Sequence, residues 1–399
     1  MRVVLIADTF PPLRTSGAVQ LRDLAQEFVR QGHTLTVMLP AAGLSAPWSL
    51  EDFQGVQVLR LRSPKTKDIN YVSRTINEFL MPFAMLRNLR KSTLAKERWD
   101  GVVWYAPSIF HGPLANALKK ASGCKGYLII RDIFPEWAAD MGLMGRGLPY
   151  KFFKAVANHQ YSVADVIGIQ TQGNQAYFAD RSNSRIEVLQ NWLADAPNVG
   201  CSINLAGGKF AGRTVFVYAG NMGVAQGMGV LLDVAERLLG RTDIGFLFVG
   251  RGSDKQRLIL DAEKRSLNNV AFHDEIDPTE IPGLYAQCHV GIVALDPRHK
   301  THNIPGKFLS YMQAGLPVLA SINPGNDLEA MILREAVGRV CTDQSVVNLH
   351  RLALELVDEV ATGSVAAGNA AVTYRCKTLC AKLFSPETAV RQIVAALKK

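Results

Sequence analysis

Short, continuously apolar runs alternate along the chain with longer segments in which apolar residues recur every three or four positions. Residues 3–7 (VVLIA) have the pattern of a buried strand, and Leu21, Leu24 and Phe28 share one face of a helix that Gly32 closes. A second strand pattern, residues 33–40 (HTLTVMLP), follows directly. This order of strand, loop, helix and strand is typical of a parallel sheet with helical crossovers.

The same order begins again near Arg213. Residues 214–220 predict a strand, 221–229 a glycine-rich loop and 230–240 a helix. Further strand patterns occupy residues 99–107, 125–132, 164–172, 244–252, 269–276, 289–296 and 316–321.

The repeated order predicts an α/β fold of two doubly wound, Rossmann-like domains facing each other across a cleft. We expect an N-terminal acceptor-binding domain at 1–185, a linker at 186–212, a nucleotide-sugar-binding domain at 213–372 and a helical tail at 373–399. Ligands of such sheets bind beyond the carboxyl ends of the strands.

Composition narrows the class of protein. The chain of 399 residues is 48% hydrophobic and 20% charged, as in an average globular protein, which excludes a low-complexity chain. Its sequence predicts neither a spanning helix nor a secretory signal. Its 6 cysteines form no CxxC pair, which favours a reducing cytoplasm over a disulfide framework or a zinc site.

The net charge of +9 is unevenly distributed. Residues 1–185 hold 23 Lys and Arg against 14 Asp and Glu, whereas residues 186–399 hold 21 of each. Within 60–98 there are 10 basic and 3 acidic residues, interleaved with apolar side chains such as Phe79, Leu80 and Phe83. This pattern favours peripheral binding to an anionic membrane surface, at the inner face of the plasma membrane. The alternatives are a solvated basic face and a helix packed on the sheet. Nucleic acid is not expected, since no nucleic-acid-binding motif is present.

The loop from Gly220 to Gly227 (GNMGVAQG) follows a strand and precedes a helix. Glycines let the backbone approach a phosphate, and the helix N-terminus supplies amide donors. The spacing is neither GxGxxG nor GxxxxGK[ST], which disfavours NAD binding and ATP hydrolysis. A tight turn without a ligand is the alternative. The loop containing Gly17 is a weaker case of the same pattern.

Two further segments carry charged residues at predicted element ends. Lys307 opens a helix after Pro305 and Gly306, where its charge opposes the helix dipole unless an anion binds there; a surface lysine is the alternative. Arg131, Asp132 and Glu136 follow the strand GYLII, and simple capping of the next element is their alternative. Because no D-x-D motif is present, we expect neither a metal site nor a cofactor.

With these loops identified, the chain resembles the retaining family-4 glycosyltransferases of GT-B architecture, and among them bacterial L-N-acetylfucosamine transferases of O-antigen and capsule assembly. The segments that carry the resemblance keep the family's order: 107–118 (PSIFHGPLANAL), 126–143 (GYLIIRDIFPEWAADMGL), 188–192 (VLQNW), 217–228 (VYAGNMGVAQGM), 248–254 (FVGRGSD) and 302–320 (HNIPGKFLSYMQAGLPVLA).

The resemblance implies a nucleotide-sugar donor, most simply a UDP-linked N-acetylated amino sugar, and a polyprenyl-diphosphate-linked saccharide acceptor. It implies three groups of donor-binding residues besides Gly17. The diphosphate is bound by Gly220, Asn221, Gly223, Gln226, Arg251 and Lys307. The nucleobase lies along His273, Asp274, Glu275 and Ile276. The donor sugar lies against His302, Asn303, Pro305 and Gly306.

The chain departs from the family pattern at two pairs of positions. Asn221 and Gln226 replace a basic pair, and His302 and Ser310 replace paired glutamates, which leaves the ribose contact of Ser310 open.

On the acceptor side, the resemblance implies Arg14, Thr15 and Glu136, with Asp132 and its neighbour Arg131 orienting the acceptor or sharing its proton. The resemblance also implies that amides, Lys307 and Arg251 stabilise the departing diphosphate, and that transfer proceeds with retention and without metal. Two alternatives stay open: a nucleotide-sugar epimerase or hydrolase of the same fold, and a non-catalytic nucleotide-sugar-binding protein.

Overall fold

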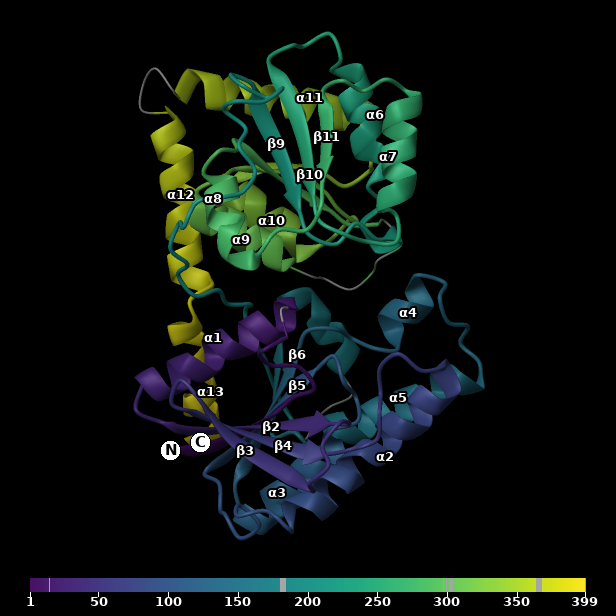
Figure 1. Cartoon of the computed structure of the whole chain (residues 1–399), viewed down its shortest axis with the longest axis vertical. Helices are drawn as coiled ribbons and strands as arrows, with labels where there is room; N and C mark the ends of the chain where they lie inside the picture. The colour runs from purple at the N-terminus through teal and green to yellow at the C-terminus, as the bar shows by residue number, and fades with distance from the viewer. Residues whose placement is uncertain are drawn as a thin grey trace. The chain divides into compact units, whose positions relative to one another are not determined.

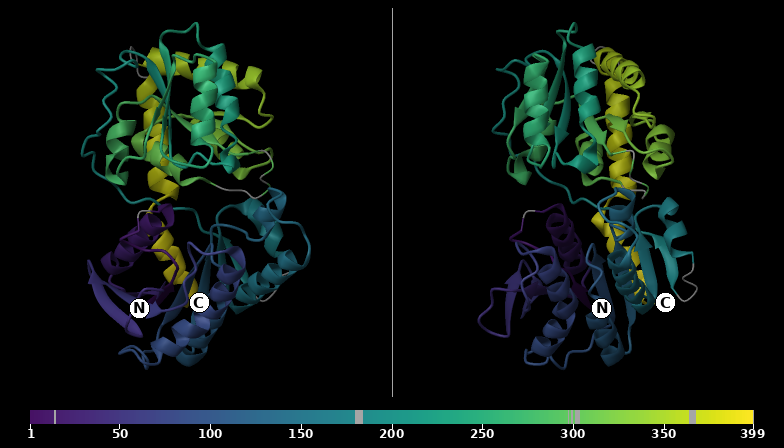
Figure 2. Two further views of the ribbon diagram at one scale, coloured as in Figure 1. Left: turned by 45° about the vertical axis from the view of Figure 1, so that its right-hand side comes forward. Right: turned by 90° about the vertical axis from the view of Figure 1, so that its right-hand side faces the viewer.

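The computed structural model describes residues 1–13, 15–179, 184–296, 298, 300, 304–363 and 368–398. The chain divides into two compact units, Met1–Trp192 with Pro386–Lys399, and Leu193–Ser385 (Figure 1). Each unit is an α/β domain built on one mainly parallel sheet with helices on both faces, as the two further views also show (Figure 2). The predicted pair of doubly wound, Rossmann-like domains is therefore confirmed.

The first unit contains an eight-stranded sheet in the order β3-β4-β2-β1-β5-β6-β7-β8. Only β3, which pairs with β4, runs antiparallel. The strands are β1 Arg2–Ile6, β2 Thr34–Ala41, β3 Trp48–Phe53, β4 Val56–Arg62, β5 Gly101–Ala106, β6 Lys125–Ile130, β7 Val166–Ile169 and β8 Arg185–Val188. The helices are α1 Ser16–Arg30, α2 Tyr71–Leu89, α3 Gly112–Ser122, α4 Glu136–Asp140, α5 Leu148–Val163 and α13 Pro386–Lys398, with a 3-10 turn at Gln172–Phe178.

Two apolar cores lie on the two faces of this sheet. Helices α1 and α13 cover one face, and α2, α3 and α5 cover the other. Strand β5 begins with Gly101, and a Cβ there would lie 2.6 Å from Cδ1 of Leu397, so glycine lets α13 pack directly against the sheet. The chain order of the strands reverses between β1 and β5, which are neighbours in the sheet.

The second unit contains a six-stranded sheet in the order β11-β10-β9-β12-β13-β14, and its chain order reverses between β9 and β12. Its strands are β9 Thr214–Ala219, β10 Ile244–Val249, β11 Val270–His273, β12 Val290–Ala294, β13 Val318–Ser321 and β14 Gly338–Cys341. Its helices are α6 Gly229–Arg237, α7 Lys255–Lys264, α8 Ile281–Tyr285, α9 Gly306–Ala314, α10 Asp327–Arg334, α11 Val346–Gly363 and α12 Gly368–Leu383, with 3-10 turns at Val224–Gln226 and Pro278–Glu280.

The unit boundaries differ from the expected ones at two places. Residues 186–192 are not a linker, because β8 completes the first sheet and Trp192 is buried in the first unit's core. Ile203, Leu205 and Phe210, also within the expected linker, are buried in the core of the second unit. The expected tail splits between the units, since α12 packs on α9 whereas α13 packs on α1 and β6.

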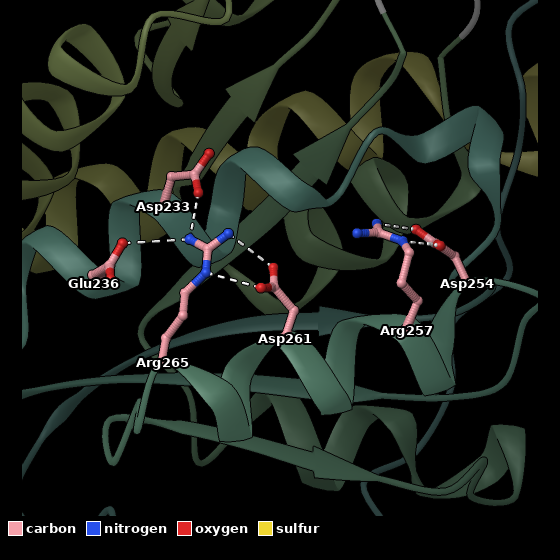
Figure 3. A network of polar contacts seen from close by, with 6 residues as sticks. All are labelled: Asp233, Glu236, Asp254, Arg257, Asp261 and Arg265. Carbon is pink, nitrogen blue, oxygen red and sulfur yellow. Dashed lines mark hydrogen bonds and ion pairs between the residues drawn. The ribbon is translucent and has the colours of Figure 1, made fainter.

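A cluster of ion pairs joins α7 to α6 on the surface of the second unit (Figure 3). The Arg265 guanidinium donates to Asp261 at 2.9 Å and to Asp233 at 2.5 Å. It lies 3.4 Å from Glu236, while Arg257 separately pairs with Asp254 at the start of the same helix. Arg265 therefore connects the neighbouring helices α6 and α7 by contacting three carboxylates, two on α6 and one on α7.

Among the residues that the structure describes, no helix combines the length and the apolar character needed to cross a bilayer.

Candidate active site

The glycine-rich loop leaves β9 at the strand-order reversal of the second sheet, where the sheets of such folds leave a crevice for ligands. The side-chain oxygen of Gln226 accepts hydrogen bonds from the Gly223 N–H at 2.9 Å and from the Asn221 amide at 3.3 Å. Gln226 thus fixes the conformation of the loop, and because it is neutral it adds no positive charge there. The two residues that replace the family's basic pair stabilise each other.

Lys307, in the first turn of α9, reaches this loop. Its Nζ donates to the Tyr218 hydroxyl at 2.9 Å and lies 4.1 Å from the centroid of the Tyr218 ring. A Cβ built on Gly220 would lie 3.7 Å from the same Nζ, so the ammonium stands directly beside the loop backbone. The Tyr218 hydroxyl in turn donates to the Asn221 carbonyl at 2.6 Å. Tyr218, which the sequence analysis did not single out, therefore positions both the cation and the loop.

The loop after β10 packs against the same backbone. A Cβ on Gly250 would lie 2.1 Å from the Gly220 carbonyl oxygen, and one on Gly252 would lie 2.2 Å from the carbonyl oxygen of Met222. Both glycines have positive φ values, 139° and 153°, which other residues rarely adopt. The Met222 N–H donates to the Arg251 carbonyl at 2.7 Å. The motif around Arg251 therefore has a structural requirement for its two glycines.

The expected cation at Arg251 and the expected nucleobase residues lie together. Arg251 is exposed and forms an ion pair of 2.8 Å with Glu275. Lys255 pairs with Asp274 at 2.6 Å and donates to the His273 carbonyl at 3.0 Å, which fixes the turn after β11. The four residues His273, Asp274, Glu275 and Ile276 form one wall of a hollow of about 580 Å³, whose other wall comes from residues 202–210.

Of the residues expected against the donor sugar, His302 and Asn303 lie outside the described part of the chain. Pro305 is the N-cap of α9 and Gly306 its first residue. Ser310 lies one turn further on, and its hydroxyl donates to the Gly306 carbonyl at 3.4 Å. Ser310 is thus engaged with its own helix.

In the first unit, the strand-order reversal lies between β1 and β5, and the N-termini of α1 and α3 begin beyond these strands. Thr15 is the N-cap of α1: its hydroxyl accepts from the Ala18 N–H at 3.3 Å and lies 3.0 Å from the Thr9 hydroxyl. Gly17 lies in the first turn of the same helix, against Thr9 and Tyr105. Arg14 lies outside the described residues.

Arg131 is buried and serves the fold. Its guanidinium donates to the carbonyls of Leu189 at 2.9 Å and Gln190 at 3.3 Å, and lies 4.6 Å from the centroid of the Trp192 ring. Burial lowers the pKa of Arg131 to about 10, still well above neutral pH. The next residue, Asp132, has an exposed side chain. Although Asp132 reaches the surface, the protein atoms packed around its carboxyl raise the pKa of that group, and the positive charge of Arg131 partly offsets this.

Glu136, the third residue expected in this segment, is the first residue of α4 and is buried. It forms an ion pair with Lys154 of α5. This pair connects α4 to α5 and positions the segment that carries Asp132.

The structure adds His111, to which the sequence analysis gave no role. It is fully buried at the N-cap of α3, and neither ring nitrogen has a hydrogen-bond partner among the described residues. Burial lowers the pKa of its imidazole, while the charge of Asp8 opposes that shift. Oδ1 of Asp8 is likewise buried without a partner in the described chain. A buried polar group without a partner has a desolvation cost, which a bound ligand can offset. The available signal was the position of a histidine directly before a helix in the segment SIFHGP.

The comparisons with known proteins agree with this arrangement. Residues 213–359, which contain the glycine-rich loop and Lys307, match the family model for glycosyl transferases group 1. WbjE of Pseudomonas aeruginosa, named as a glycosyltransferase, is 25% identical over 260 residues, which is 61% of each chain. WcaI of Escherichia coli K12, named as a colanic acid biosynthesis glycosyl transferase, is 26% identical over 216 residues, 49% of this chain and 52% of WcaI. The alignments thus span three fifths and about half the length of these relatives.

Solved structures extend the similarity to the whole fold. Sucrose-phosphate synthase of Thermosynechococcus elongatus superposes with a TM-score of 0.73 at 13% identity, covering 100% of this chain and 98% of that one. WaaG, a glycosyltransferase of lipopolysaccharide biosynthesis, gives 0.65 at 16% identity, covering 98% and 99%. HepE of Anabaena, solved with UDP and glucose, gives 0.63 at 14% identity, covering 99% of each chain. The fold is therefore that of the GT-B glycosyltransferases, and residues 213–359 match the group 1 family model.

Proposed function

We propose that this protein is a retaining, metal-independent glycosyltransferase of family 4 that transfers a sugar from a UDP-linked donor to a polyprenyl-diphosphate-linked saccharide in O-antigen or capsule assembly. The observation that carries the proposal is the position of the Lys307 ammonium beside the Gly220 backbone, at the strand-order reversal of the second sheet. A cation, loop amides and a helix N-terminus at one point form a binding site for a diphosphate.

The donor side of the mechanism follows from these groups. As the bond between the anomeric carbon and the phosphate oxygen breaks, negative charge grows on the diphosphate. Lys307, already held by Tyr218, needs little reorganisation to stabilise it. Arg251 can add a second positive charge only if it leaves its ion pair with Glu275. We therefore assign the larger part of the charge stabilisation at the diphosphate to Lys307. The turn from His273 to Ile276 supports a nucleobase site in the adjoining hollow.

On the acceptor side, we propose Asp132 as the group that orients the acceptor hydroxyl. That hydroxyl forms the new bond to the anomeric carbon on the face from which the diphosphate departs, and its proton passes to the departing phosphate oxygen or to Asp132. A raised pKa makes the Asp132 carboxyl a better proton acceptor than an ordinary aspartate. Arg131 and Glu136 act as positioning residues through their contacts with Trp192 and Lys154. The name of WcaI, a colanic acid biosynthesis glycosyl transferase, supports a bacterial polysaccharide as product. The resemblance to L-N-acetylfucosamine transferases supports an N-acetylated amino sugar as donor.

The test is release of UDP from a panel of UDP-sugars that includes UDP-L-FucNAc, with and without a polyprenyl-diphosphate-linked sugar. A transferase releases UDP in amounts equal to the glycosylated lipid formed, and only when both substrates are present. Release without acceptor indicates a hydrolase, and conversion of the donor without release indicates an epimerase. Tight UDP binding without any turnover indicates the non-catalytic binding protein.

We further propose that the first unit binds an anionic membrane surface peripherally through residues 60–98. The structure separates the apolar residues of this stretch. Met81 and Met85 of α2 are buried in the core, whereas Phe79, Leu80 and Phe83 are exposed. Helix α2 therefore keeps exposed apolar side chains after it has packed on the sheet, and interfacial binding to a membrane requires such side chains.

Vesicles of phosphatidylglycerol and phosphatidylcholine should bind the protein at low salt and release most of it at high salt, because surface charges are screened within about 8 Å at physiological ionic strength. Charge reversal of four exposed basic residues of this stretch should abolish vesicle binding and leave UDP affinity intact: Arg74, Arg87, Arg90 and Lys91, each to Glu. Unchanged sedimentation of that variant with vesicles would exclude this surface.

A further inference from the structure

The exposed apolar residues of α2 form a continuous stripe and not a scatter. Val72, Ile76, Phe79, Leu80 and Phe83 are spaced so that they share one side of the helix, and each is at least 44% exposed. The opposite side, with Met81 and Met85, is buried against the sheet. A helix that packs through one apolar side and presents a second one to solvent has more apolar surface than folding requires.

Helix α5 lies alongside α2 and presents a matching surface (Figure 1). Leu148 and Phe152, one turn apart on α5, are 82% and 40% exposed. The rings of Phe79 and Phe152 meet across the two helices at 6.1 Å between centroids.

Between the two helices lies a cavity of about 270 Å³, whose accessible lining is almost wholly apolar. Its walls include Phe79, Pro82 and Phe83 of α2 and Phe152, Ala155 and Val156 of α5. An apolar cavity of about 150 Å³ already stays dry and takes up benzene. The hollow between α2 and α5 is larger but open to solvent on one side, so a hydrocarbon chain can lie in it with one flank exposed.

A chain of aromatic contacts leads from this cavity to the segment of Asp132. Phe152 meets Phe153 at 5.4 Å, and Phe153 meets Phe134 at 5.1 Å. Phe134 lies two residues after Asp132. Phe110, which lines the cavity, contacts Phe153 at 6.4 Å and directly precedes the buried His111. One apolar layer thus joins the cavity to both groups at the carboxyl edge of the sheet.

The charges around the cavity fit an anionic amphiphile. Arg87 lies exposed one turn after the lining residue Phe83 on α2, and Lys151 lies exposed directly before the lining residue Phe152 on α5. Lys154, one turn after Lys151, is already engaged by Glu136. A molecule with a hydrocarbon chain and a phosphate head can therefore bury the chain while its head stays close to cations.

We propose that the cavity between α2 and α5 is a binding subsite for the hydrocarbon chain of the lipid-linked acceptor, with the acceptor's head group held towards Asp132. This inference rests on the proposed function for the identity of the amphiphile. It differs from membrane attachment, because a chain subsite binds one monomeric lipid chain and needs no bilayer.

The experiment compares n-dodecyl phosphate with n-butyl phosphate, which share a head group and differ in chain length, by calorimetry below the micelle concentration. The parent protein should bind the dodecyl ester more than about tenfold more tightly, since each further methylene buried adds affinity. Ala155→Trp places an indole into the cavity from an exposed position and should abolish this preference. Phe83→Ser opens the wall and should weaken it about fivefold. Ala381→Trp, the same change at an exposed position of α12, is the matched control and should keep the preference.

Equal binding of the two esters by the parent, or an undiminished preference in both Ala155→Trp and Phe83→Ser, would overturn the subsite. If the parent sediments with anionic vesicles but shows no preference for the dodecyl ester, the face binds a bilayer as a surface only, and the subsite is likewise excluded. The probes contain neither sugar nor nucleotide, and UDP affinity is measured on the same variants. If the parent does not prefer the dodecyl ester but still transfers sugar from the UDP-sugar, the subsite alone is refuted. If it prefers the dodecyl ester but transfers no sugar, the proposed function alone is refuted.

Discussion

Replacing Lys307 by Met tests the diphosphate site most directly, because the structure separates the catalytic effect of the change from its effect on stability. A lysine in the first turn of a helix opposes the dipole by about 0.3–1 kcal/mol. The contact of its ammonium with the Tyr218 ring, at 4.1 Å, returns about 0.5–1 kcal/mol. These terms nearly cancel, so we expect the free energy of unfolding to change by less than about 1 kcal/mol.

The expected effect on transfer is much larger. Lys307 is held beside the loop by the Tyr218 hydroxyl at 2.9 Å, so it is oriented before the diphosphate develops charge. Losing one such preorganised group costs about 2.7–4 kcal/mol of transition-state stabilisation, or about 100- to 1,000-fold in kcat. Tyr218→Phe keeps the cation but loses its orienting hydroxyl, and should cost about tenfold or less.

The assay measures acceptor-dependent UDP release for the parent and each variant, with thermal unfolding recorded in parallel. Lys264→Met removes an exposed lysine of α7 and serves as the matched control, with turnover expected within about twofold of the parent. Near-normal turnover of Lys307→Met would refute the assignment of the diphosphate to this loop. Equal losses of turnover and stability would instead mean that Lys307 acts through the fold.

Three further predictions follow from other groups. Transfer in excess EDTA should stay within about twofold of transfer without it, because protein groups stabilise the negative charge of the departing diphosphate. Complete, reversible loss of transfer would contradict this. His111→Leu should not destabilise the fold at pH 7, since the ring nitrogens of His111 have no hydrogen-bond partner in the described chain to lose. Burial lowers the pKa of His111, so below about pH 6.5 this histidine takes up a proton in the unfolded chain but not in the folded protein. Falling pH therefore destabilises the parent through His111 and has no such effect on His111→Leu. Urea unfolding should show the variant gaining stability relative to the parent from pH 7 to pH 5. Arg265→Met should cost about 1–2 kcal/mol in the same assay, unlike exposed Arg237→Met.

The sequence predicted the elements whose residues form long apolar runs and missed those defined by their neighbours. The central strands β1, β5, β9 and β10 are buried on both faces, so each is continuously apolar. β3 is a mostly exposed edge strand, WSLEDF, and has no such run. β8 has only 4 residues, which pair with β7, and most of it falls in the range 186–212 that Pro197 and four glycines mark as a linker in the sequence. Edge strands take their conformation from the strand they pair with, and this information is not local.

The same distinction explains which site residues were predictable. The glycine-rich loop and Lys307 are separate local motifs, and the sequence identified both. Their connection through Tyr218 depends on β9 and β12 being adjacent, which only the sheet order determines. The structural role of Arg131 depends on carbonyls 58 and 59 residues away. Within the described chain, the ring nitrogens of His111 and Oδ1 of Asp8 have no partner. This is a property of the packed protein, and no spacing of residues in the chain encodes it.

The two sheets reverse strand order at one place each, and the chemistry of the two places differs in a way that supports the division of labour proposed above. At a reversal, the helices that follow the two neighbouring strands leave to opposite faces, so the edge between them stays open. In the second sheet this edge carries an ammonium, Lys307, and a glycine backbone, which suit a diphosphate. In the first sheet it carries the carboxylate of Asp8, with the fully buried His111 beneath, and a carboxylate suits hydroxyl groups. Exchanging the roles would set the donor's diphosphate against Asp8, which is unfavourable. Charge therefore supports the proposed assignment of the donor to the second unit, as does the family match of residues 213–359.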